Sequence, residues 1–387
     1  MRALQLYAGP QALAHIAANG LQNADIRAVA AAAGGPKGLV LGALDRFIFG
    51  NWLAASSHEI HLVGASIGAW RMATACLDNP AEGFQRLERD YIAQHYELKP
   101  GQKRPSAEFV SEQFGQSLRD FYGGRVDEVL RHPRYRLHVL TSRGRHVLGR
   151  EGAWRTPLGY AGAFFANAVH RRAMGAWLER VVFSSQHAPL PFAPNDYRTR
   201  QVLLTAANFM QAVQASCSIP FLLQSVRNIP GAPPGAYWDG GITDYHLHLD
   251  FAGAAKSGAM DSIAVNANSI RGNGQFGKIK RVETGARIVL YPHFQKAVVP
   301  GWLDKGLKWR HKATHHLDTM LLLAPNPEWV KALPNGKLPD RTDFTRYGND
   351  FAGRAKAWNT AVAASAQMAD EFALWLEKPG SLPVLPI

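Results

Sequence analysis

The sequence contains very little cysteine. Cys76 and Cys217 are the only two among 387 residues, and both lie in apolar stretches. Two cysteines are too few for a disulfide framework. Isolated cysteines in apolar surroundings are typical of buried thiols rather than of redox or metal ligands. The sequence therefore excludes a fold stapled by disulfides.

Long hydrophobic segments are also missing. No run of about 18 apolar residues occurs, which argues against a membrane-spanning helix. The N-terminus, MRALQLYAGPQALAHIAANG, lacks a charged start followed by an unbroken apolar stretch and a cleavage site, so it does not resemble a signal peptide. We therefore expect a cytoplasmic protein, with peripheral membrane contact as an option.

Acidic residues are fewer than basic ones. Asp and Glu number 30 against 43 Lys and Arg, which gives a formal net charge of +13. A positive field attracts nucleic acid, phospholipid headgroups or acidic metabolites without choosing among them. The basic residues are scattered, and no helix-turn-helix, zinc-finger or aromatic RNA-binding pattern occurs. We expect no nucleic-acid partner.

One segment, Gly301–Lys312, combines tryptophans and leucines with basic residues. This mixture is typical of an interfacial helix on an anionic membrane, where each basic residue adds about 1 kcal/mol. A solvated helix that packs its tryptophans inward has the same composition. Both interpretations stay open, and the sequence does not determine the oligomeric state.

Hydrophobic residues make up 47% of the chain and can form a large core. The length, with no internal repeat and no sharp boundary, favours one domain over residues 1–387. We expect its motif-bearing core at about residues 26–250 and a C-terminal elaboration at about residues 251–387.

Strand and helix patterns alternate along the first hundred residues. Ile26–Ala33 and Glu59–Val63 are apolar strand-like runs, and each precedes a glycine and a helical apolar pattern. Two consecutive strand–turn–helix units predict an α/β fold, a mainly parallel sheet layered between helices. Further strands are expected at Tyr135–Leu140, Arg180–Phe183, Ile263–Ala267 and Arg287–Tyr291, and helices at Ala107–Phe121, Tyr160–Arg180 and Ala352–Leu376.

The second strand–helix junction carries a Gly-x-Ser-x-Gly motif, Gly64-Ala65-Ser66-Ile67-Gly68. In a nucleophile elbow the serine occupies a strained turn, and small residues two positions away let strand and helix approach. The N-terminal amides of the following helix face the charge that develops on a substrate. The alternative is a structural turn with a serine cap.

The first strand–helix junction is glycine-rich, with Gly34, Gly35 and Gly38 around Pro36 and Lys37. Its spacing fits neither the dinucleotide fingerprint nor the nucleotide P-loop. Glycine amides can face an oxyanion because no side chains obstruct them. We expect an oxyanion hole here, and Lys37 either attracts phosphate or, more simply, lies exposed to solvent.

A third motif, Asp239-Gly240-Gly241, follows Trp238. An acid before two glycines lies on a turn whose backbone can pack closely against a neighbour. Asp-Gly turns are common on their own, so the interpretation of Asp239 depends on the other two motifs.

Together these motifs resemble the patatin-like phospholipases. That family has a glycine-rich oxyanion loop, then a Gly-x-Ser-x-Gly nucleophile, then an Asp-Gly-Gly or Asp-Gly-Ala motif. The small-residue segment Ala215–Pro220 also looks family-like, and the similarity covers roughly Ala28–Tyr245. Ala32 and Ala33 stand where the family usually has Asp and Gly, and Lys37 stands where Arg is commoner.

The resemblance implies a Ser–Asp dyad without histidine, a patatin-like three-layer fold and a lipid or acyl-ester substrate. Ser66 would attack the ester carbonyl, and Asp239 would act as the base. The amides of Gly34, Gly35 and Ile67 are candidates for the oxyanion hole, with Lys37 and Gly38 in the same loop. An aspartate has an ordinary pKa near 3.9 and is a poor base unless burial raises it.

Two alternatives remain for the chemistry. His246 and His248 follow Asp239 in the order of Ser–His–Asp hydrolases, although they lie only a few residues beyond it. A catalytically inactive protein that binds lipid or another anion on the same fold is the second alternative. Intact Ser66 and Asp239 argue against it.

Histidine-rich stretches near the end of the chain invite a metal interpretation. Neither set matches a recognised ligand spacing, so we expect neither a metal nor a cofactor. The two sets are His246, His248 and Asp250, and His311, His315, His316 and Asp318.

Overall fold

A computed structural model of the chain describes residues 1–96, 105–256 and 287–387. Its centre is an eleven-stranded sheet in the order β11-β1-β10-β9-β2-β3-β4-β5-β6, with β8 paired to β4 and β7 to β8. The strands are β1 (Leu4–Ala8), β2 (Ile26–Ala31), β3 (Ile60–Ala65), β4 (Tyr135–Gly144), β5 (Leu178–Ser184), β6 (Thr199–Leu203), β7 (Val226–Arg227), β8 (Ala236–Asp239), β9 (Ile288–Pro292), β10 (Met320–Pro325) and β11 (Val384–Pro386).

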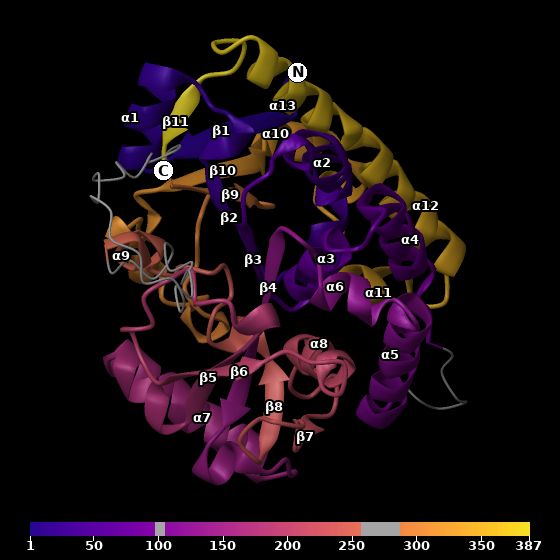
Figure 1. Ribbon diagram of the computed structural model, residues 1–387. Coiled ribbons are helices and arrows are strands. Elements are labelled where there is room, and N and C mark those ends of the chain that lie inside the picture. The colour runs from indigo at the N-terminus through magenta and orange to yellow at the C-terminus, as the bar shows by residue number, and fades with distance from the viewer. Residues whose placement is uncertain (97–104, 257–286) are drawn as a thin grey trace, which may run out of the picture.

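Helices cover both sides of this sheet. Figure 1 shows α2, α3, α4, α12 and α13 gathered on one side of the central strands and α1 and α9 on the other. The mainly parallel, three-layer α/β class predicted above is confirmed. The α-helices are α1 (Pro10–Asn19), α2 (Gly42–Phe47), α3 (Ile67–Ala75), α4 (Pro80–Ala93), α5 (Ala107–Tyr122), α6 (Val126–Leu130), α7 (Arg155–Val169), α8 (Phe209–Cys217), α9 (Phe251–Lys256), α10 (Pro327–Ala332), α11 (Thr342–Tyr347), α12 (Phe351–Ala364) and α13 (Ala366–Glu377).

The central strands β10, β9, β2, β3 and β4 run parallel to one another. Their residues are almost all buried because helices cover both faces. The carboxyl ends of β2 and β3 therefore lie at the same edge, where the glycine loop and the serine turn begin. This edge is where open parallel sheets bind their ligands.

The last third of the chain enters the sheet. β9 pairs with β2, and β10 lies between β9 and β1. The final strand β11 pairs with β1, so the first and last strands of the chain are neighbours. The strands after residue 287 therefore separate β1 from β2, its successor in the sequence.

Two predicted helices differ in the structure. The helix expected over Tyr160–Arg180 ends at Val169, and β5 begins at Leu178 as a buried partner of β4. The helix expected over Ala352–Leu376 is divided at Ser365 into α12 and α13. The Ser365 hydroxyl donates to the carbonyl of Val362, a side-chain bond that competes with the regular helix. The strand expected at Ile263–Ala267 lies outside the described residues.

The interfacial helix considered for Gly301–Lys312 is wrong. The segment forms two short 3-10 turns, Trp302–Asp304 and Lys308–Arg310. The buried Asp304 carboxylate between them accepts hydrogen bonds from three side chains, those of Asn167, Arg171 and Arg310. These bonds anchor the segment to the protein interior, and the segment does not form a continuous helix.

Among the described helices, none has both the length and the apolar content needed to cross a membrane.

Candidate active site

Ser66 occupies the tight turn between β3 and α3 that the motif predicts. Its φ is 57°, a conformation that residues other than glycine rarely adopt. A Cβ on Gly68 would lie 1.9 Å from the carbonyl oxygen of Ala31, and one on Gly64 would lie 2.4 Å from the carbonyl oxygen of Gly68. Both glycines are therefore required for the close approach of strand and helix.

The structure places Asp239 directly beside this serine. The Ser66 hydroxyl donates a 2.7 Å hydrogen bond to Oδ2 of Asp239, 173 positions along the chain. Asp239 ends β8, where it lies opposite Thr141 of β4. Its other oxygen, Oδ1, accepts a 2.7 Å hydrogen bond from the amide of Gly241. The carboxylate is thus oriented on one side by its own turn and on the other by the serine.

Burial controls the acidity of Asp239. Loss of hydration raises the pKa of its carboxyl above the ordinary value. The Ser66 hydroxyl, the charge of Arg341, the Gly241 amide and the charge of Lys305 all act in the opposite direction without cancelling the effect. A raised pKa brings an aspartate closer to the range in which a general base is effective.

Ser216 supports the serine turn, and sequence reasoning did not single it out. Its hydroxyl accepts a 2.9 Å hydrogen bond from the Ser66 amide and donates a 2.7 Å bond to the carbonyl of Leu140 on β4. Ser216 lies in α8 within the segment Ala215–Pro220 noted above. The small residues of that segment were visible in the sequence, but the partners of this hydroxyl were not.

The glycine loop follows β2 and turns into a 3-10 helix over Gly35–Leu41. Lys37 and Gly38 lie inside that helix, where amides bond to the carbonyl three residues before them. No hydrogen bond within the described part of the chain uses the amides of Gly34, Gly35 or Ile67. These amides remain available to an oxyanion.

The loop and the start of α3 are in contact. A Cβ on Gly38 would lie 3.1 Å from Cγ1 of Ile67, so the glycine allows the two elements to pack closely. Gly35, Ser66 and Ile67 line one common pocket. Two of the three residues with available amides therefore line the pocket that contains the serine.

The Asp-Gly-Gly turn packs closely against β4 and against the start of the glycine loop. A Cβ on Gly240 would lie 2.1 Å from the carbonyl oxygen of Leu140, and one on Gly241 would lie 2.6 Å from Cβ of Ala33. The amide of Ala33 donates a 3.0 Å hydrogen bond to the carbonyl of Tyr245. The three motifs are thus joined at the carboxyl edge of the sheet.

Comparison with known families agrees with this geometry. The model of the family described as patatin-like phospholipase matches residues 32–247, more than half of the chain. The chain belongs to the patatin-like phospholipase family. This places it within a family of lipid acyl hydrolases. No curated protein matches the chain.

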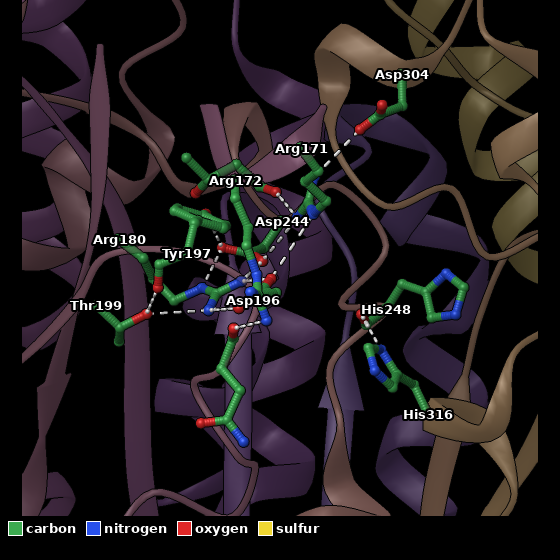
Figure 2. Close-up of polar contacts among 12 residues, drawn as sticks. Arg171, Arg172, Arg180, Asp196, Tyr197, Thr199, Asp244, His248, Asp304 and His316 are labelled. Atoms are coloured by element: carbon green, nitrogen blue, oxygen red, sulfur yellow. Dashed lines mark hydrogen bonds and ion pairs between the residues drawn. The ribbon is translucent and has the colours of Figure 1, made fainter. Parts of the chain in front are cut away.

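In this member of the family, buried ion pairs hold the segment that follows the Asp-Gly-Gly turn (Figure 2). Arg180 donates from Nε to Asp244 at 2.8 Å and from Nη1 to Asp196 at 2.8 Å. Nearby, Arg171 forms a 3.2 Å ion pair with Asp304. The sequence did not indicate this network, because its members come from separate segments of the chain.

The two histidines of the Ser–His–Asp alternative bond elsewhere. Nδ1 of His246 lies 3.0 Å from the carbonyl oxygen of Ala297 and 3.1 Å from the amide nitrogen of Val299. Nε2 of His248 lies 2.8 Å from the hydroxyl of Thr314. The Ser66 hydroxyl instead reaches its carboxylate directly.

Two adjoining pockets meet at the dyad. The apolar pocket contains Ser66 and is lined by large side chains that include Trp70, Tyr91, Phe114 and Leu223. The cationic pocket contains Asp239 and is lined by Lys37, Lys305, Arg341 and Trp302, among others. Because Ile219 and Arg341 line both, the pockets are neighbours.

The solvent-exposed placement expected for Lys37 is wrong. The side chain is half-buried in the cationic pocket, and its Nζ lies 5.3 Å from the centroid of the Phe294 ring. Burial lowers the pKa of this lysine. Phe294 follows β9, so its position beside the loop depends on the C-terminal strands.

Neither histidine set considered for a metal comes together as a whole. Asp250 from one set meets His315 and His316 from the other, with potential ligand atoms within 4.8 Å of one another. Asp250 already accepts a 2.8 Å hydrogen bond from the amide of Gly253 at the start of α9.

Proposed function

We propose that this chain hydrolyses carboxylic ester bonds of lipids, as a phospholipase A or lysophospholipase does, through an acyl-enzyme on Ser66 with Asp239 as general base. The observation that carries the proposal is the 2.7 Å hydrogen bond from the Ser66 hydroxyl to the Asp239 carboxylate. A nucleophile and its base must lie within such a distance before a proton can pass between them.

The reaction follows in two halves. Asp239 accepts the hydroxyl proton as Ser66 Oγ attacks the ester carbonyl, and the carbonyl oxygen takes the negative charge. When the tetrahedral intermediate collapses, Asp239 returns the proton to the leaving alcohol and the acyl group stays on Ser66. A water then attacks the acyl-enzyme carbonyl while Asp239 accepts a proton from it. When this second intermediate collapses, Asp239 returns the proton to Ser66 Oγ, the bond from Ser66 to the acyl group breaks, and the fatty acid leaves.

The amides of Gly34, Gly35 and Ile67 are the proposed oxyanion donors. Each such donor contributes about 3 kcal/mol to the stabilisation of the transition state in serine hydrolases. Gly35 and Ile67 line the pocket that contains Ser66. The positive end of the α3 dipole, which begins at Ile67, adds to the same effect.

The apolar pocket supports an acyl chain as the group transferred to Ser66. Its lining is mostly apolar and aromatic, with Trp70, Tyr91, Phe114 and Leu223 beside the serine. Burial of hydrocarbon stabilises binding by about 25 cal/mol per Å². We therefore place the acyl chain on this side and the alcohol on the side of Asp239.

The dyad is tested with a short-chain nitrophenyl ester and three proteins: wild type, Ser66→Ala and Asp239→Asn. We expect each substitution to lower kcat/KM by on the order of 10³-fold or more, because nucleophile and base act as one unit. A fluorophosphonate should label Ser66 in the wild type only, which peptide mapping by mass spectrometry would show. Equal activity in all three proteins would refute the dyad.

The alternatives give different results in the same assay. An inactive binding protein would show no turnover and no labelled serine in the wild type. A histidine mechanism predicts that His246→Gln with His248→Gln abolishes turnover, whereas the Ser–Asp mechanism predicts that a folded double variant retains it. Thermal unfolding of the double variant shows whether it is folded.

A further inference from the structure

Three positively charged side chains converge on the cationic pocket without an anionic partner. In the ranges that the structure describes, no hydrogen bond or ion pair involves the side-chain nitrogens of Lys37, Lys305 or Arg341. Nζ of Lys305 lies 4.1 Å from the centroid of the Tyr245 ring. The Arg341 guanidinium lies against the oxyanion loop, with Nε 3.2 Å from the position of a Cβ on Gly35.

The two acids that line this pocket act on these cations by charge, since Asp340 raises the pKa of Lys37 and Asp239 that of Lys305, but their hydrogen bonds go to other groups. Asp340 lines the pocket, but its Oδ1 accepts a 2.6 Å hydrogen bond from Nζ of Lys337 and further bonds from Thr342. The other lining acid is Asp239, whose Oδ2 and Oδ1 are bonded to Ser66 and Gly241.

The positive charges of these three side chains repel one another. Burial, followed by the charges of Arg341 and Lys37, lowers the pKa of Lys305 to about 8. Lys37 is half-buried, whereas Lys305 and Arg341 are exposed at the mouth of the pocket. Like charges held close together repel one another until an anion binds among them. The arrangement is therefore prepared for a negatively charged group.

We propose that the cationic pocket binds a phosphate group on the alcohol side of the ester, held by Lys37, Lys305 and Arg341. The planar fork of an arginine and the point charges of lysines together suit the several oxygens of a phosphate. The assignment to the alcohol side rests on the proposed function, in which Ser66 takes the acyl chain and Asp239 protonates the leaving alcohol.

Lys305 and Arg341 lie beyond the residues matched by the family model, which end at 247. Their contribution is thus a property of the C-terminal part of this chain. It makes the substrate class an acyl ester of a phosphorylated alcohol, such as an acylglycerol phosphate.

Binding is tested without turnover by titrating Ser66→Ala with glycerol 3-phosphate in a calorimeter. When Lys305→Gln or Arg341→Gln is combined with Ser66→Ala, binding should weaken by about tenfold or more, as expected for loss of a charge-assisted contact. Lys308→Gln, an exposed lysine outside the pocket lining, is the matched control and should leave binding unchanged. No binding, or equal binding by all variants, would overturn the site.

Inorganic phosphate distinguishes the source of the anion. The proposal predicts that glycerol 3-phosphate binds more tightly than phosphate alone, because the pocket continues to the ester. Equal affinities would overturn the assignment to the substrate's alcohol and leave a site for free phosphate.

Kinetics then test specificity. The ratio of kcat/KM for an acylglycerol phosphate to that for the monoacylglycerol with the same chain should fall about tenfold in Arg341→Gln. An unchanged ratio contradicts the proposal. Failure of the dyad would instead appear as turnover by Ser66→Ala, with phosphate binding by that variant unaffected, so the two failures are distinguishable.

A second, independent feature is the exposed face of α7. Trp154, Leu158, Phe165 and Val169 are 88%, 67%, 68% and 85% exposed. Scattered exposed apolar residues are ordinary, but several large ones along one helix mark an interaction surface. We call these four residues the α7 patch.

The surroundings of the α7 patch indicate a lipid surface. From Gly152 to Leu178 the sequence contains no Asp or Glu, and Arg155 and Arg172 are exposed. Apolar and aromatic side chains combined with basic ones are typical of helices that lie on anionic membranes. These two arginines have the same charge sign as the whole chain, whose formal net charge is +13.

The helix that carries the α7 patch also contacts, through its buried Tyr160, a segment that borders the cationic pocket. The exposed Phe221 ring lies 6.1 Å from the ring of Tyr160 in α7. Phe221 directly follows Pro220, which lines the cationic pocket.

We infer that the α7 patch docks on a phospholipid bilayer that contains anionic lipid. Cosedimentation with phosphatidylcholine vesicles, with and without phosphatidylglycerol, tests it on the full chain. Leu158→Asp with Phe165→Asp should reduce binding to the anionic vesicles by at least about tenfold. The double substitution puts charge where hydrocarbon would otherwise enter the bilayer. Leu374→Asp, an exposed leucine on α13, is the control and should bind as wild type.

Two outcomes would refute membrane docking. One is vesicle binding that is equal in the double variant and the control. The other is a wild type that fails to bind vesicles and instead forms a dimer that the double variant loses, which would assign the α7 patch to a second copy of the chain.

Discussion

At the scale of single residues, the site combines a strained serine with a buried carboxylate. Ser66 keeps a positive φ because β3, α3 and the Ser216 hydroxyl surround it. Asp239 has few polar partners, and burial raises the pKa of its carboxyl. Such groups are costly to the fold and are concentrated at functional sites.

The pH dependence of hydrolysis should report the Asp239 pKa. The base acts when ionised, so kcat/KM for a neutral ester should rise as pH increases through the raised pKa. Arg341 lowers that pKa by its charge, so Arg341→Gln should move the rising limb to higher pH. Arg346→Gln, an exposed arginine on α11, should leave the limb in place. A shift to lower pH in Arg341→Gln would contradict this account.

The backbone clearance at the serine turn gives a stability prediction. Gly68→Ala should lower the free energy of unfolding by about 1–3 kcal/mol or more, because its Cβ would meet the backbone of Ala31 and Ala32. Gly306→Ala, where a Cβ meets nothing within 4 Å, should change it little. Urea denaturation of both variants measures the difference, and equal midpoints would exclude the close packing.

At the scale of elements, a buried ion pair fixes the helix behind the serine. Arg71 of α3 donates from Nε to Oδ2 of Asp45 at 2.6 Å and from Nη2 to Oδ1 at 2.7 Å. Asp45 belongs to α2, the helix that follows the glycine loop. The bidentate pair therefore joins the helices that follow the oxyanion loop and the nucleophile.

Breaking this pair should be expensive. Asp45→Ala leaves a buried guanidinium unpaired and should lower the free energy of unfolding by about 3–5 kcal/mol. The exposed pair of Glu328 with Lys331 provides the comparison, and Glu328→Ala should lower it by no more than about 1 kcal/mol. Chemical denaturation monitored by circular dichroism measures both, and similar losses would mean that burial does not strengthen the first pair.

At the scale of the whole molecule, the C-terminal residues belong to the sheet and to the pockets. β9 and β10 lie between β1 and β2, Phe294 packs beside Lys37, and Lys305 and Arg341 line the cationic pocket. Without the rest of the chain, the core expected at residues 26–250 would therefore have an unpaired edge on β2, where β9 now lies.

A truncated chain tests whether residues 1–387 fold as one domain. Residues 1–250 alone would expose the edge of β2 and leave β1 without β10, so we expect aggregation or loss of cooperative unfolding. The full chain should unfold in a single transition. A soluble fragment with its own sharp transition would show that the core is an independent domain.

The sequence alone determined the features that depend on local backbone geometry. Gly64, Ser66 and Gly68 predicted a turn by their residue types and spacing, and Asp239 before two glycines did the same. The contacts that require these glycines include distant residues such as Ala31 and Leu140. The alternation of strands and helices determined the α/β class for a similar reason, since hydrophobic periodicity is a local property.

Only the tertiary structure decided which distant residues meet. Ser216 supports the elbow across 150 positions, and Arg341 reaches Gly35 from the far end of the chain. No local pattern encodes these contacts, because they depend on how α8 packs against β3 and β4 and on how the C-terminal part of the chain packs against the glycine loop. The nucleophile was thus recognisable in the sequence, whereas the cationic surroundings that bear on its substrate exist only in the folded molecule.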